Sequence, residues 1–177
     1  NYRFRAQVTD PAGNASTTAL FPVIVGTSAT AVALKAIDAE FAKTFDASAL
    51  TTITGSAGDL LEVMGSAGIT KAAGVNLSVT SGTATVAQAN QLDDTTTGTI
   101  TATISDQTIA ALAGLNSSVN AYTITVADTT ATAASLTTLD SKTSIRIDAK
   151  AVTAITGTAA EIRTAVTTAN MIGMNGT

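Results

Sequence analysis

The stretch FDASALTTITGSAGDL, residues 45–60, recurs as IDAKAVTAITGTAAEI, residues 147–162. The two align without a gap at an offset of 102 positions, and 8 of the 16 positions are identical. The alignment extends over residues 29–69 and 131–171, with 14 identities in 41 positions. A third, weaker copy spans residues 84–119, where ANQLDD matches SLTTLD and ISDQTIAALAG matches IDAKAVTAITG. An internal repeat of this kind gives information about the architecture of the protein, because repeated segments form repeated structural units. It does not indicate a chemical reaction.

Each copy contains extended pieces followed by helical pieces. The extended pieces alternate apolar and polar residues with period two, at 75–82, 99–106, 122–128 and 144–148. Their predicted buried residues are Val75, Leu77, Val79, Ile100, Ala102, Ile104, Tyr122, Ile124, Val126, Ile145 and Ile147. The predicted helices are 30–43, 56–68, 83–92, 132–142 and 158–171. Ser56 with Asp59 and Thr158 with Glu161 have capping-box spacing, each just after a glycine.

A repeating unit of one strand and one short helix, about 20–28 residues long, has the period of a solenoid, because such a unit buries its apolar face only against its neighbours. Residues 28–177 are therefore predicted to form a repeat solenoid of short parallel β-strands alternating with short helices. We expect strands 75–79, 99–104, 122–126 and 144–147 to pair in parallel in one sheet, since parallel neighbours need a crossover. Ile155, in the repeated Ile-Thr-Gly corner, is expected to be buried. The alternative is a single α/β domain that contains an old duplication.

The N-terminal segment, residues 1–27, has a different pattern. Two alternating apolar runs flank a turn at Asp10, Pro11, Gly13 and Asn14, whose residue types favour turns, and this predicts a β-hairpin. The run YRFRAQVTDPAGNAS is similar to the last strands of bacterial immunoglobulin-like repeats. A sandwich of that class needs about seven strands, so we expect this hairpin to pack on a preceding domain or on a neighbouring subunit. The chain opens at Asn1 without a methionine, and we interpret it as a piece of a longer or processed chain.

The composition excludes several classes of function. Charged residues make up 12% of the chain, the formal net charge is −4, and Lys and Arg are scattered, so binding of nucleic acid is not expected. The absence of His and Cys removes the commonest general base, nucleophile and metal ligands. No GxSxG or phosphate-loop motif is present, and no apolar run is long enough to span a membrane. We expect neither an enzyme nor a cofactor-binding protein.

Four aspartates mark equivalent corners of the repeat, at Asp46, Asp106, Asp128 and Asp148. Stacked in one column, these carboxylates would repel unless a cation bridged them, and calcium prefers oxygen ligands of this kind. Alternatively, each aspartate caps the next turn through its own side chain. The interpretation favoured here is the turn cap, with calcium as the alternative.

Threonine dominates the polar face of the extended pieces. The positions are Thr99, Thr101, Thr103, Thr123 and Thr125. They resemble the flat hydroxyl array of ice-binding solenoids, although Asn76, Ser78 and Arg146 interrupt the pattern. The simpler explanation is that threonine suits an exposed strand face.

The phrase VTAITGTAAE, residues 152–161, within a chain of 35 Ala and 35 Thr, resembles the VTxITGTAAD phrase of the Ala/Thr-rich repeats in large extracellular surface proteins of bacteria, especially the cyanobacterial type. The resemblance covers most of residues 29–172. It implies a secreted structural protein at the cell surface, a subunit of a filament, fibre or surface layer. We expect head-to-tail self-assembly in which Asn1 to Val25 contacts another copy. The alternative is a ligand-binding adhesin module, stabilised by calcium, in a large secreted repeat protein.

Overall fold

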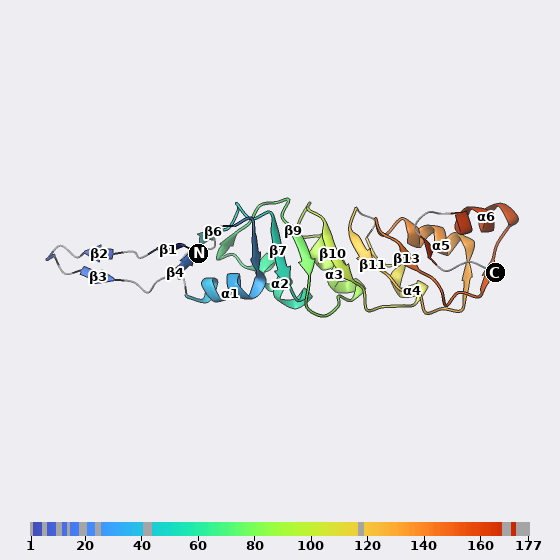
Figure 1. Ribbon diagram of the computed structural model, residues 1–177, viewed down its shortest axis with the longest axis horizontal. Helices are drawn as coiled ribbons and strands as arrows, with labels where there is room; N and C mark the ends of the chain where they lie inside the picture. The colour runs from blue at the N-terminus through green and yellow to red at the C-terminus, as the bar shows by residue number, and fades with distance from the viewer. Residues whose placement is uncertain are drawn as a thin grey trace.

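The computed structural model describes residues 2–4, 7–9, 12–13, 15–17, 21–23, 26–40, 44–116, 119–167 and 171–172. From residue 26 onward the chain forms an elongated α/β structure of alternating strand–helix units that follow one another along its long axis (Figure 1). No helix in these ranges has the length and apolar character needed to span a membrane.

A five-stranded parallel sheet runs along much of the structure, in the order β11-β10-β9-β7-β5. Its strands are β5 (Ser28–Thr30), β7 (Thr52–Gly55), β9 (Asn76–Val79), β10 (Ile100–Thr103) and β11 (Ala121–Thr123). The paired residues are Ser28 with Thr52, Thr52 with Asn76, Leu77 with Ile100, and Thr101 with Ala121. Successive strands are thus separated along the chain by the predicted period of the repeating unit.

The helices connect successive strands, which is why all the strands of this sheet point the same way. They are α1 (Ala31–Glu40), α2 (Ala57–Gly65), α3 (Val86–Asp93), α4 (Ile109–Leu112), α5 (Ala133–Asp140) and α6 (Ala159–Thr167). Three further parallel pairs complete the units: β6 (Phe45–Asp46) with β8 (Ile69–Thr70), β12 (Thr130–Thr132) with β14 (Ala154–Thr156), and β13 (Ile147–Asp148) with β15 (Met171–Ile172).

The repeat seen in the sequence is also a repeat of structure. The segment β5-α1-β6-β7-α2-β8 is matched by β12-α5-β13-β14-α6-β15, and the strand and helix starts lie 102 positions apart. The registers match as well, since Ala29 pairs with Ile53 and Ala131 with Ile155. We call residues 28–70 the first copy and residues 130–172 the second copy.

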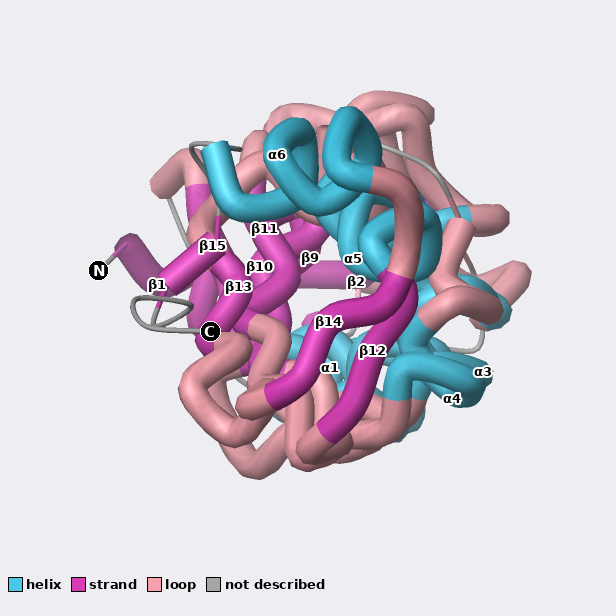
Figure 2. The backbone as a smooth tube through the Cα atoms, turned by 90° about the vertical axis from the view of Figure 1, so that its right-hand side faces the viewer, coloured by secondary structure: helices cyan, strands magenta, loops and turns pink. Residues whose placement is uncertain are grey.

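The second copy does not return to the same side of the structure. The chain just after β11 pairs with β13, because Thr125 forms a parallel bridge to Asp148. Backbone hydrogen bonds run from Val126 N to Asp148 O (2.8 Å) and from Asp148 N to Ile124 O (2.9 Å). β13 corresponds to β6, so β12 and β14 form a separate pair on another side. Figures 1 and 2 accordingly show α1 and α6 on opposite sides of the long axis.

The N-terminal segment forms two antiparallel pairs. β1 (Tyr2–Phe4) pairs with β4 (Phe21–Val23), and β2 (Gln7–Thr9) pairs with β3 (Ala15–Thr17). Gly13 has a φ of 85° in the connecting turn, as the turn prediction requires, while Asp10, Pro11 and Asn14 lie outside the described residues. These strands extend beyond the N-terminal end of the strand–helix units (Figure 1).

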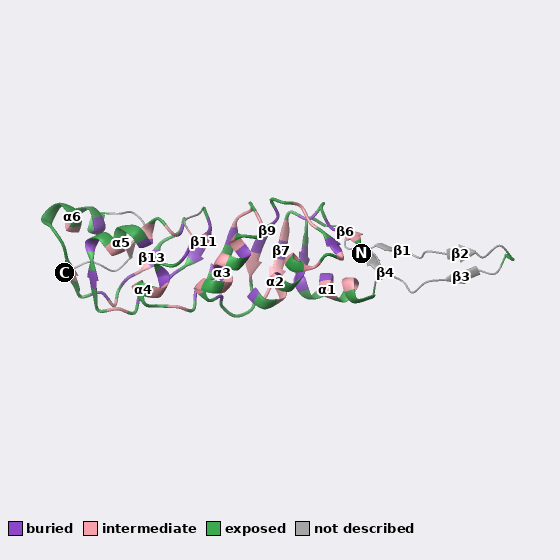
Figure 3. Cartoon of the chain, turned by 180° about the vertical axis from the view of Figure 1, so that it is seen from behind, coloured by how far each residue is buried: buried purple, intermediate pink, exposed green. Residues whose placement is uncertain are grey.

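The core is a set of rows that run from unit to unit. Ala29, Ile53, Leu77 and Ile100 are neighbours in the sheet register, and all four are buried. Buried residues, drawn in purple in Figure 3, recur in the strands and helices along the length of the units. Small side chains allow close stacking: a Cβ at Gly55 or Gly157 would lie 3.0 or 3.2 Å from the Cβ of Ala31 or Ala133 in the preceding unit.

Several predictions about local structure are confirmed. Nine of the eleven residues predicted to be buried in strands are buried, and Val79 is half-buried. In α2 the Ser56 side chain accepts the Asp59 N–H. At the start of α6, Thr158 and Glu161 make both bonds of a capping box, with Glu161 Oε2 accepting the Thr158 N–H (2.7 Å).

Other predictions are wrong. Strand 144–147 does not join the five-stranded sheet: only Ile147 and Asp148 are in a strand, β13, and Ile145 is 37% exposed. The sheet instead includes β5 and β7, which were not predicted. The third copy diverges at α4, a helix where the alignment expects the strand corner. Met171 lies in β15 and not in the last helix. Ile155 is only half-buried, because among the described residues no strand pairs with the second side of β14.

Candidate functional site

The four predicted aspartates are not stacked as one column. Asp46 stands opposite Thr70, and Asp148 stands opposite Ile172 and Thr125. Each accepts a hydrogen bond two residues ahead, from Ser48 N to Asp46 Oδ1 (2.8 Å) and from Lys150 N to Asp148 Oδ1 (3.1 Å). Hydrogen bonds from the side chain and the backbone of Ser48 hold the pKa of Asp46 below its ordinary value, and hydrogen bonds from the backbone and the side chain of Lys150 do the same for Asp148.

Asp106 and Asp128 act on a neighbouring unit instead. Asp106 Oδ2 accepts the N–H of Val86 (2.7 Å), and Asp128 Oδ2 accepts the N–H of Ile109 (2.6 Å). Val86 and Ile109 are the first residues of α3 and α4, so each carboxylate satisfies a free N–H at a helix start and lies at its positive end. Asp46 and Asp148 thus bond within their own turns, whereas Asp106 and Asp128 cap the helix start of another unit. Among the described residues, no group of three or more acidic side chains is placed to hold a metal ion.

The predicted threonine face is on the outside of the five-stranded sheet. Thr103 pairs with Thr123, and both are exposed, as are Thr101 and Thr125, while Thr99 is half-buried. A longer row was missed in the sequence. It passes through Thr30, Thr54, Ser78 and Thr101 and ends at Ala121. Its hydroxyls repeat at the strand spacing, roughly 4.8 Å.

A buried polar cluster was also missed. Asn120 is almost fully buried; its Oδ1 accepts the Ile100 N–H (2.8 Å), and its Nδ2 donates to Asp93 Oδ1 (2.7 Å) and to the Tyr122 hydroxyl (2.8 Å). Thr143 Oγ1 accepts the Tyr122 N–H (2.9 Å). Burial, and then the charge of Asp93, raise the pKa of Tyr122. Because each of these groups has a partner, the cluster joins adjacent units at little cost. Asn120 has the same strand parity as Tyr122, Ile124 and Val126, and that signal was available in the sequence.

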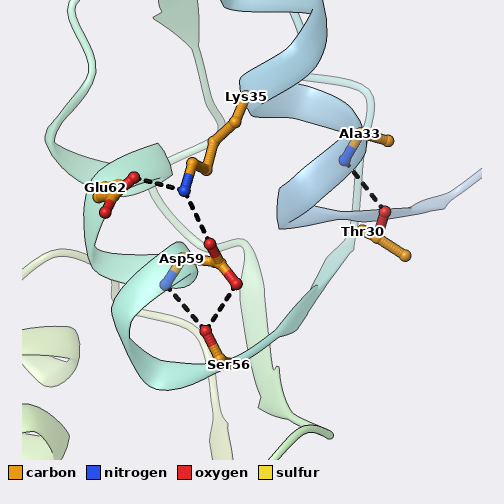
Figure 4. A network of polar contacts seen from close by, with 6 residues as sticks. All are labelled: Thr30, Ala33, Lys35, Ser56, Asp59 and Glu62. Carbon is orange, nitrogen blue, oxygen red and sulfur yellow. Dashed lines mark hydrogen bonds and ion pairs between the residues drawn. The ribbon is translucent and has the colours of Figure 1, made fainter.

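An ion-pair network joins α1 to α2 (Figure 4). Lys35 Nζ binds Asp59 Oδ1 (2.7 Å) and Glu62 Oε2, and the Ser56 hydroxyl donates to Asp59 Oδ2 (2.6 Å). The bonds to Lys35 and Ser56 hold the pKa of the Asp59 carboxyl below its ordinary value, and Asp59 and Glu62 raise the pKa of Lys35. In the second copy Thr137 occupies the place of Lys35, so this network has no counterpart there.

The two ends of the stack expose apolar residues whose counterparts inside it are buried. At the N-terminal end Ile37 and Phe45 are half-buried, whereas their counterparts Leu139 and Ile147 are buried. At the C-terminal end the half-buried residues are Ile155, Ile162 and Met171, and their buried counterparts are Ile53, Leu60 and Ile69. Val166, on α6, is 42% exposed. We call residues 37 and 45 the N-terminal surface, and residues 155, 162, 166 and 171 the C-terminal surface.

Comparison of the chain with protein-family models, with curated proteins and with solved structures finds no match. Function is therefore inferred from the geometry of the units and of the two ends.

Proposed function

We propose that the chain is a solenoid-type structural protein and a subunit of an extracellular filament, fibre or surface layer. The continuous parallel pairing from β5 to β11, in which each strand pairs with the strand of the next unit, supports the solenoid class. The low content of charged residues, the lack of cysteine and the resemblance to bacterial surface repeats support an extracellular location.

The observation that carries the assembly proposal is the pair of open ends. Natural solenoids protect their ends with polar capping repeats. Here the residues that define both end surfaces are apolar. Ile37, Phe45, Ile155, Ile162 and Met171 are less buried than the residues at the equivalent positions of the other copy. Covering apolar area stabilises a complex by about 25 cal/mol per Å², so a neighbour on either end gains free energy. Because the two surfaces differ, subunits join head to tail, and such contacts give open filaments unless the rotation closes a ring.

The N-terminal strands supply a second contact in this proposal. Two-stranded hairpins are marginally stable alone in water, and β1 to β4 extend beyond the first unit (Figure 1). Residues Asn1 to Val25 therefore pack on the adjacent copy and lengthen the interface.

The test measures assembly against protein concentration by sedimentation velocity and negative-stain microscopy. The intact chain is expected to form filaments, and deletion of residues 1–25 is expected to weaken them.

Val166→Lys places a charge on the C-terminal surface, and an unpaired charge in an apolar interface is costly. We expect it to raise the concentration needed for assembly about tenfold, which corresponds to roughly 1.4 kcal/mol. Val119→Lys is the matched control, because Val119 is 75% exposed and lies away from both ends. An intact chain that stays monomeric at high concentration contradicts the proposal.

The hydroxyl row on the sheet favours a second candidate function. A ligand-binding adhesin module would use this row, in which Thr30 and Thr101 are exposed and Thr54 and Ser78 are half-buried, as its binding face. In that case negative-stain images show single particles, and Thr54→Val with Thr101→Val abolishes binding to a surface ligand without changing the fold.

A further inference from the structure

We infer that strand β14 pairs in parallel with β5 of a second copy, with Ser28 opposite Ala154, Ala29 opposite Ile155, and Thr30 opposite Thr156. This inference rests on the proposed self-assembly and specifies the surfaces and the register that perform it.

The internal repeat provides the first observation. Within the first copy β5 pairs with β7, and within the second copy β12 pairs with β14 in the same register. β14 therefore has the same position relative to β12 as β7 has relative to β5. On its other side β7 is covered by β9, whereas among the described residues β14 has a strand partner on one side only, and so does β5. In the part of the chain that the structure describes, each end therefore has an edge strand with one side unpaired, and such an edge can pair with another strand.

The side chains of the two strands also fit one another. In both copies a small residue faces a large one across the pair, since Ala29 is opposite Ile53 and Ala131 is opposite Ile155. Stacking β5 of a second copy on β14 continues this alternation as Ala131, Ile155, Ala29, Ile53. The half-buried Ile155 then gains the second neighbour that Ile53 already has in Leu77.

A second row meets at the same time. Phe45 pairs with Ile69 in the first copy, and Ile147 pairs with Met171 in the second copy. The same stacking places Phe45 of the second copy against Met171, and both side chains are half-buried without it. A thioether against an aromatic ring is a favourable contact. In this arrangement β14 pairs with β5 of the second molecule, β15 lies next to its β6, and α6 lies next to its α1. The units inside each copy are arranged in the same way.

The experiment uses engineered cysteines, because the chain has none of its own. Register partners in neighbouring strands have Cα atoms within the range that a disulfide bridges, about 4.4–6.8 Å. Ser28 and Ala154 are exposed. They precede α1 and α6 in the chain, and these helices lie at opposite ends of the strand–helix units (Figure 1). After mild oxidation, the Ser28→Cys/Ala154→Cys variant is expected to give a reducible ladder of dimers, trimers and larger species on a denaturing gel. A mixture of the two single variants is expected to give one mixed dimer and no ladder.

Two matched variants control the geometry. Ser28→Cys/Thr52→Cys pairs two register partners of one chain and is expected to close a disulfide within the monomer. Ser28→Cys/Thr156→Cys is displaced by two residues, about 7 Å along the strand, and is expected to give no ladder.

The outcomes separate the register from self-assembly itself. Filaments without a 28–154 ladder, or with a 28–156 ladder in its place, overturn the register and leave the proposed function standing. Dimers formed by Ser28→Cys alone overturn head-to-tail stacking. A chain that stays monomeric overturns both, and the C-terminal surface then belongs to a different partner.

Discussion

The first copy of the repeat, residues 28–70, and the second copy, residues 130–172, have the same secondary structure and the same strand register. Their burial differs. Ile53 and Leu60 are inaccessible to solvent in the first copy, whereas Ile155 and Ile162 are half-buried in the second. At the other end the order is reversed, because Phe45 is half-buried and Ile147 is buried. Burial at equivalent positions of the repeat is thus set by the neighbours of a unit more than by the residue itself.

The largest expected effect comes from placing a charge at the same point of both copies. Ile53→Asp is expected to destabilise the fold by about 4 kcal/mol or more, because an unpaired carboxylate there is enclosed by adjacent units. Ile155→Asp is expected to cost about 1–2 kcal/mol, since its side chain reaches water. Urea unfolding followed by far-UV circular dichroism, at concentrations too low for assembly, measures both. Equal losses would mean that Ile155 is as enclosed as Ile53.

A smaller effect is expected from the glycines that end β7 and follow β14. Gly55→Ala and Gly157→Ala are each expected to cost about 1–3 kcal/mol, because the new methyl group contacts Ala31 or Ala133. Gly157 has a φ of 151°, which adds backbone strain. Ala31→Gly should therefore restore more of the stability of Gly55→Ala than Ala133→Gly restores for Gly157→Ala. The same unfolding assay tests this, and equal recovery would contradict the contribution of φ.

The smallest effect concerns the ion pair present only in the first copy. The pKa of Asp59 is lowered from 3.8, so its ionised pair with Lys35 stabilises the fold above that value, and this stabilisation is lost as the pH falls through the lowered pKa. Lys35→Met should reduce the unfolding midpoint at neutral pH and leave it unchanged in strong acid. Thr137→Met, at the equivalent site, should show no such dependence on pH. The comparison fails if both variants respond to pH alike.

Much of the fold was predictable because the long alternating strands and the capped helices have clear local signals. Residues Leu77, Ile100 and Tyr122 were correctly placed in the core, and the capping bonds of Ser56 and Thr158 are present. The strands β5 and β7 were not predicted, because each contributes only one buried residue between polar ones, as in Thr52-Ile53-Thr54. A pattern this short does not show an alternation of apolar and polar residues. The pattern Thr-Ala-Thr at 130–132 is the same signal and was equally missed.

The side of the structure on which the second copy lies was beyond prediction from the repeat alone. The offset between the two copies gives no information about the units that lie between them. These units differ in length, because the paired residues Leu77 and Ile100 are 23 positions apart whereas Thr101 and Ala121 are 20 positions apart. The aspartate sites had the same difficulty. Asp106 and Asp128 bind helix starts in another unit, and such partners depend on the stacking register, which no local motif encodes.

The direction of the hydrogen bonds between units has a mechanical consequence. In parallel strands that follow one another along the long axis (Figure 1), these bonds lie close to that axis. A tensile force between the two ends therefore loads these rows in series, so every row carries the same tension and the rows separate one after another, the weakest first. A released unit gives up a rise of roughly 5 Å and, at about 3.4 Å per residue, supplies about 80 Å of extended chain. Under tension, the protein would lengthen in steps of that size and take up mechanical work at each step while the remaining units stay folded.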